Sequence, residues 1–120
     1  MAPRILVVED EVTLAKNIAK YLRRYGYDTW IAESGETGLE MYATFKPDIV
    51  LLDFMLGGIN GLEVMARIRA RDMQTKIILM TAHGSVEIAV KAIKSGAYDY
   101  LSKPLVLSEL RLLVDKAIAA

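Results

Sequence analysis

The chain has 120 residues, a length typical of one globular domain, and carries fifteen basic and fifteen acidic residues. This balance argues against a domain that itself holds nucleic acid, because such binding draws on net positive charge. Without cysteine the chain forms no disulfide. Its apolar runs are too short for a signal peptide or a membrane span, so we expect a cytoplasmic protein with no direct membrane or nucleic-acid contact.

Short apolar runs predict five strands. They are expected at residues 5–8, 28–32, 49–52, 77–80 and 98–101, with the second the weakest. The runs at 5–8, 49–52 and 77–80 are continuous rather than alternating, which is typical of parallel strands covered on both faces.

Helical periodicity separates these runs. Apolar residues recur at i, i+3, i+4 and i+7 within residues 15–22, 86–93 and 110–117. Ser34, Asn60 and Ser85 stand where helices should begin, Asn60 with the capping-box partner Glu63, and Gly96 can end the helix that Ser85 starts. The arginines at 67, 69 and 71 are interpreted as a solvent-exposed helix face.

This alternation predicts a single α/β domain over residues 1–120, a three-layer, doubly wound sheet of five parallel strands. The last helical pattern runs to the end of the chain, which is compatible with a domain cut from a longer protein. In such sheets ligands bind at the carboxyl ends of the strands.

Acidic residues stand at two of these strand ends. The first strand is followed by Glu9 and Asp10, and the third by Asp53. With a flavodoxin-like strand order, 2-1-3-4-5, the three carboxylates converge and repel one another, and Mg²⁺ is a cation that suits such oxygen ligands. Glu9 and Asp10 could instead only solvate a loop and begin a helix, but packing gives no reason for a carboxylate at Asp53.

Two further strand ends add a hydroxyl and an ammonium group. Thr81 ends the fourth strand and Lys103 follows the fifth. Thr81 alone is more often an ordinary strand-end threonine, and Lys103 alone is usually a solvated lysine. Together with a carboxylate nucleophile and a cation, they form a set suited to phosphoryl transfer, which depends on positioning and charge neutralisation.

Four motifs resemble those of response-regulator receiver domains of two-component systems. They are Ile5-Leu-Val-Val-Glu-Asp-Glu, Leu51-Leu-Asp-Phe-Met-Leu, Met80-Thr-Ala and Leu101-Ser-Lys-Pro. The stretches Thr81-Ala-His-Gly-Ser and Gly96-Ala-Tyr-Asp-Tyr-Leu are most similar to receivers attached to AAA+ activators of alternative-sigma-factor transcription. The resemblance spans essentially the whole chain and implies the flavodoxin-like receiver fold.

The resemblance also implies roles at the acceptor. Asp53 would accept the phosphoryl group, forming an acyl phosphate. Asp10 would bind Mg²⁺ directly, Glu9 through water, and Met55 through its backbone carbonyl. The bond between Lys103 and the following proline would be cis.

Further implied roles concern signalling. Thr81 and Lys103 would contact the phosphoryl oxygens, and a shift of Thr81 would let Tyr100 turn inward as a switch. Met55 and His83 would tune the lifetime of the phosphoryl group. The surface of the fourth helix, fifth strand and fifth helix would change and is a candidate homodimer surface.

The implied function is that of a phosphoacceptor. The domain would take its phosphoryl group from a sensor histidine kinase, catalyse only its own phosphorylation and dephosphorylation, and control an effector domain, with transcription as the expected output. Three alternatives stay open: an aspartate-nucleophile phosphatase, which usually has a second aspartate where this chain has Met55; a flavin carrier, whose phosphate loop would not be acidic; and an unphosphorylated interaction module.

Overall fold

A computed structural model describes residues 2–82 and 86–120 of the chain. Strands and helices alternate along these residues, as predicted. The strands are β1 (Arg4–Val8), β2 (Asp28–Ala32), β3 (Ile49–Asp53), β4 (Lys76–Thr81) and β5 (Asp99–Ser102). The helices are α1 (Val12–Arg24), α2 (Gly35–Phe45), α3 (Gly61–Arg69), α4 (Val86–Lys94) and α5 (Leu107–Ala119).

The strands form one parallel sheet in the order β2-β1-β3-β4-β5, which confirms the predicted topology. The continuous apolar runs belong to the three central strands, where nearly every side chain is buried. The edge strands β2 and β5 are partly exposed. On β2 the ring of Trp30 stacks on Phe45 of α2, with 4.8 Å between ring centroids, which protects that edge.

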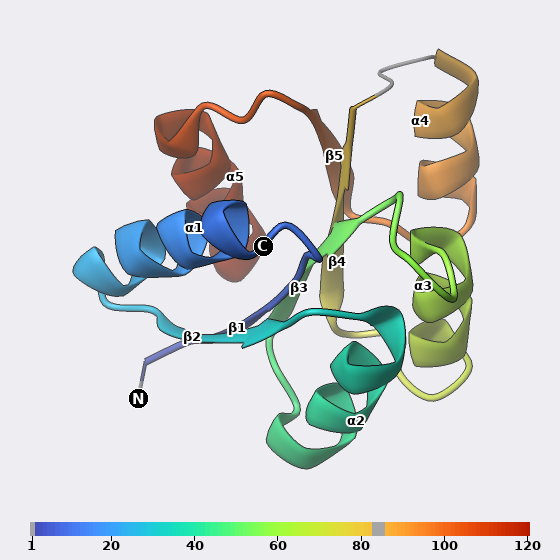
Figure 1. Cartoon of the computed structure of the whole chain (residues 1–120), viewed down its shortest axis with the longest axis horizontal. Helices are drawn as coiled ribbons and strands as arrows, with labels where there is room; N and C mark the ends of the chain where they lie inside the picture. The colour runs from blue at the N-terminus through green and yellow to red at the C-terminus, as the bar shows by residue number, and fades with distance from the viewer. Residues whose placement is uncertain (1, 83–85) are drawn as a thin grey trace.

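Helices cover both faces of the sheet (Figure 1). α1 and α5 lie on one face, and α2, α3 and α4 lie on the other. Two apolar clusters fill the space between the sheet and these layers. In the part of the chain that the structure describes, no helix combines the length and the apolar character needed to cross a membrane.

Capping residues that the sequence predicted stand at the starts of two helices, α2 and α3. The Ser34 hydroxyl accepts a hydrogen bond from the backbone N–H of Thr37, 3.1 Å away, at the start of α2. The Asn60 side chain accepts one from the N–H of Glu63, 2.9 Å away, at the start of α3. Each bond satisfies a donor that the first helical turn leaves free. The predicted cap at Ser85 lies outside the described residues.

Helix α4 is confirmed, but most of the apolar stripe that predicted it faces outward. Its buried side chains are those of Ala89 and Ala92. The side chains of Val86, Val90 and Ile93 are 78%, 46% and 46% exposed. α4 therefore packs on the sheet through two small residues and presents larger apolar ones to solvent.

Backbone hydrogen bonds continue past the carboxyl ends of the central strands. The N–H of Phe54 donates to the carbonyl of Met80 over 2.8 Å, and the N–H of Lys103 donates to the carbonyl of Thr81 over 2.8 Å. These bonds hold the ends of β3, β4 and β5 together. As a result, Asp53, Thr81 and Lys103 lie at one edge of the sheet.

Candidate functional site

Three carboxylates meet where β1 and β3 end. One oxygen of each of Glu9, Asp10 and Asp53 lies within 4.8 Å of the others. Glu9 is fully buried and Asp53 is 3% exposed, whereas Asp10 is exposed. The strands that carry them are neighbours in register, so the sheet itself brings the acids together.

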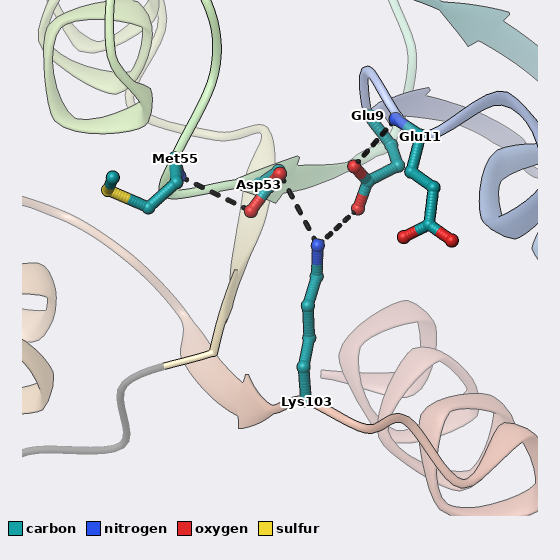
Figure 2. A network of polar contacts seen from close by, with 5 residues as sticks. All are labelled: Glu9, Glu11, Asp53, Met55 and Lys103. Atoms are coloured by element: carbon teal, nitrogen blue, oxygen red, sulfur yellow. Dashed lines mark hydrogen bonds and ion pairs between the residues drawn. The ribbon is translucent and has the colours of Figure 1, made fainter.

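Lys103 faces two of these acids (Figure 2). Its Nζ lies 2.6 Å from Oε1 of Glu9 and 3.3 Å from Oδ2 of Asp53. The peptide bond between Lys103 and Pro104 is cis, as expected. The sequence indicated that Lys103 would lie near Asp53, but it gave no sign of the pairing with Glu9, because two strands, β3 and β4, lie between β1 and β5.

The electrostatics of the site follow from burial and from these contacts. Burial raises the pKa of Glu9 to about 6; the charge of Asp53 adds to this rise, while hydrogen bonds from Lys103 and the N–H of Glu11 oppose it. Burial opposes the charge of Lys103, yet its hydrogen bond to Glu9 and the charge of Asp53 outweigh burial, so its pKa is raised. The cluster holds three carboxyl groups and one ammonium group, so the site favours a further cation.

Oxygen donors of this kind fit Mg²⁺. Glu9, Asp10 and Asp53 offer hard carboxylate ligands from one small region, and exposed Asp10 leaves the ion access to water. The acidic cluster is thus suited to a divalent cation that keeps several water ligands.

Among the remaining predicted residues, Met55 contacts Asp53 directly. The backbone N–H of Met55 donates to Oδ1 of Asp53 over 3.3 Å, while its side chain is 58% exposed and points away from the carboxylate in Figure 2. Thr81 is buried at the end of β4, and Tyr100 on β5 is 36% exposed. His83, the other predicted lifetime residue, lies outside the described residues.

Gly61 is a residue of the site that was not predicted from the sequence. A Cβ built on it would lie 2.5 Å from the carbonyl oxygen of Asp53 and 2.9 Å from Cα of Phe54. Its own N–H donates to the Phe54 carbonyl over 3.0 Å. The start of α3 therefore packs directly against the backbone that carries Asp53, and only a residue without a side chain fits there.

Known proteins resemble this chain in sequence and fold. The family model described as the response regulator receiver domain matches residues 5–115. Regulatory protein AtoC of Escherichia coli (strain K12) is 37% identical over 115 residues, which are 96% of this chain and 25% of AtoC. The transcriptional regulatory protein YkoG of Bacillus subtilis (strain 168) is 40% identical over 114 residues, which are 95% of this chain and 50% of YkoG.

A solved structure agrees with these relatives. The receiver domain of the Francisella response regulator 1452 superposes with a TM-score of 0.91 at 30% identity, covering 96% of this chain and 95% of that one. The chain spans between a quarter and a half of the length of AtoC and YkoG. From its motifs, its strand order and these likenesses, the chain belongs to the family of receiver domains of two-component response regulators.

Proposed function

We propose that Asp53 is the phosphoacceptor of this receiver domain and that Mg²⁺ binds beside it. The observation that carries the proposal is the position of the Asp53 carboxylate at the end of β3. One of its oxygens lies 3.3 Å from Nζ of Lys103, and the group shares a cluster with Glu9 and Asp10. A nucleophile, a fixed cation and ligands for a mobile cation are thus grouped around one point.

The reaction is a transfer from a phosphohistidine of a sensor kinase. An oxygen of Asp53 attacks phosphorus, the new P–O bond forms as the P–N bond breaks, and the histidine leaves and takes up a proton. Lys103 contacts the phosphoryl oxygens and Thr81 donates its hydroxyl to them. Asp53 and Asp10 directly, Glu9 through water and Met55 through its carbonyl would hold Mg²⁺, which would neutralise phosphoryl charge.

The free energy of a single hydrogen bond limits how far Thr81 alone can switch the domain. A hydrogen bond to a charged group contributes about 1.5–3 kcal/mol. Moving a population from 1:99 to 99:1 needs about 5.5 kcal/mol. Lys103 therefore shares the work with Thr81 in drawing the β4 end inward and letting Tyr100 turn.

The domain acts on itself rather than on a substrate that it releases. It catalyses its own phosphorylation and the later hydrolysis of its acyl phosphate, in the cytoplasm. Met55 and His83 set the lifetime of that group. Met55 also argues against turnover as a phosphatase, because its thioether cannot serve as a general acid.

The output is proposed to be transcription through an effector domain. AtoC and YkoG carry regulatory names, and both are longer than this chain. The surface formed by α4, β5 and α5 is proposed for homodimerisation. Its support is the exposure of apolar side chains of α4, among them Val86, Val90 and Ile93.

A small phosphodonor tests the acceptor. Acetyl phosphate is added with and without Mg²⁺, and the intact protein is weighed. We expect one added phosphate that requires Mg²⁺, is absent in Asp53→Asn, and is retained in the control Asp28→Asn, which alters an exposed aspartate on the edge strand β2.

Three outcomes would contradict the proposal. A phosphate retained in Asp53→Asn would place the acceptor elsewhere. Continuous release of phosphate from many substrates would indicate a phosphatase. A folded protein that gains no mass from the donor would indicate an interaction module.

A further inference from the structure

Arg69 on α3 differs from the arginines on either side of it. Its Nε and Nη2 donate to the carbonyl of Gly96 over 2.9 and 2.8 Å, and its Nη1 donates to the carbonyl of Asp72 over 3.0 Å. Burial lowers the pKa of Arg69, and the charge of Asp72 opposes that shift. Arg67 and Arg71 are exposed. The predicted solvent-exposed face is therefore wrong for Arg69.

Gly96 lies in the turn between α4 and β5 and is shaped to receive this side chain. Its φ of +109° is a backbone conformation that favours glycine. A Cβ built on Gly96 would lie 2.8 Å from Nε of Arg69. The guanidinium group thus packs directly on the backbone that follows α4.

The second anchor, Asp72, is itself firmly held. Its carboxylate accepts hydrogen bonds from the hydroxyls of Thr75 (2.5 Å) and Tyr42 (2.7 Å) and from the backbone N–H groups of Gln74 (2.7 Å) and Thr75 (3.3 Å). These bonds, that of the Thr75 hydroxyl first, hold the pKa of Asp72 well below its usual range. Arg69 therefore links the α4–β5 turn to α2 and to the segment before β4.

The contacts of Arg69 anchor α4 beyond one of its ends. Its C-terminal end is followed by Gly96 and by the bonds from Arg69. Along its length α4 buries only the small residues Ala89 and Ala92, whereas Val86 at its first turn is 78% exposed. The N-terminal end lies nearer in sequence to Thr81, at the edge of the sheet where the carboxylates gather.

We propose that Arg69 is a positioning residue that fixes the C-terminal end of α4 to α3, so that α4 responds to the acceptor site by moving its N-terminal end about this fixed point. The movement rests on the proposed phosphorylation of Asp53. The fixed end does not, because the contacts of Arg69 exist without a phosphoryl group.

Hydrogen exchange of single amides, followed by NMR on the full chain, tests the fixed end. In unphosphorylated Arg69→Met, amides of residues 92–98 should exchange at least about ten-fold faster, equivalent to about 1.4 kcal/mol. Amides of α1 and β1 should keep their rates. The matched control Arg67→Met, on the same helix, removes an exposed ion pair with Glu63 and should change none of these rates.

Two further variants test the same contact in case Arg69→Met does not fold. Arg69→Lys keeps the charge but cannot donate to both carbonyls as a planar fork, so it should show a smaller local increase. Gly96→Ala disturbs the same contact at the residue whose carbonyl accepts the hydrogen bonds from Arg69, and it should give the same local increase in exchange. Unchanged exchange of residues 92–98 in these variants, or an equal loss of protection across α1 and β1, would overturn the proposal.

Acetyl phosphate with Mg²⁺ tests the movement. In the natural sequence, phosphorylation should alter exchange of residues 86–90 and leave 92–96 unchanged. In Arg69→Met, with the same added mass, the change should spread to residues 92–96. An identical pattern in both proteins would refute the fixed point. If the natural sequence gains no phosphate, the proposed function fails while the exchange result without donor still decides the role of Arg69.

Discussion

The buried carboxyl group of Glu9 should make folding stability depend on pH. Burial raises its pKa from 4.5 to about 6, with the charge of Asp53 adding to the rise. An acid whose pKa is higher in the folded state contributes stability that is complete below pH 4.5 and is lost as pH rises through about 6. The difference between 4.5 and about 6, at about 1.36 kcal/mol per pH unit, corresponds to about 2 kcal/mol.

Urea unfolding followed by circular dichroism, in the presence of EDTA, measures this contribution. Between about pH 4.5 and pH 7.5 the free energy of unfolding of the natural sequence should fall by about 2 kcal/mol relative to that of Glu9→Gln. Asp10→Asn, which alters an exposed acid of the same cluster, should retain the fall, and Mg²⁺ should reduce it. If the natural sequence and Glu9→Gln differ equally at both pH values, the assignment of the effect to Glu9 is refuted.

Two substitutions test packing and hydrogen bonding away from titration at the cluster. Gly61→Ala should lower the free energy of unfolding by about 1–3 kcal/mol, because its Cβ meets backbone at 2.5 Å; urea unfolding that matches the natural sequence would contradict this. Asp72→Asn should cost about 1.5–3 kcal/mol near neutral pH through weaker hydrogen bonds from Tyr42 and Thr75. The lowered pKa of Asp72 means that this difference is present above pH 3.8 and shrinks as pH falls further, so a difference that grows in acid would oppose the reasoning.

The sequence predicted the sheet and the acidic edge well, and for the same reason. Continuous apolar runs mark strands that are covered on both faces, and parallel strands end at a common edge. Once β1 and β3 are neighbours, Glu9, Asp10 and Asp53 have to converge. The Asn60 cap was also readable, because it depends on spacing within a single turn.

Contacts between side chains that are far apart in the sequence could not be predicted from local patterns. The bond from Lys103 to Glu9 crosses two strands and depends on how a long side chain folds over the sheet. The case of Arg69 had a usable signal. Residues i and i+2 lie on different faces of a helix, so Arg67 and Arg69 could not both belong to one solvent-exposed face of α3.

The Trp30 ring that stacks on Phe45 at the edge of the sheet can serve as an intrinsic fluorescence probe. Trp30 is the only tryptophan of the sequence. In the sheet register it lies level with Leu6 and Val50, three residues before Asp53 along β3. Its fluorescence emission therefore reports whether β2 remains packed on Phe45, and it is remote from charge added at the acceptor. A phosphodonor that shifts this emission has therefore changed the packing of Trp30 at the edge of the sheet.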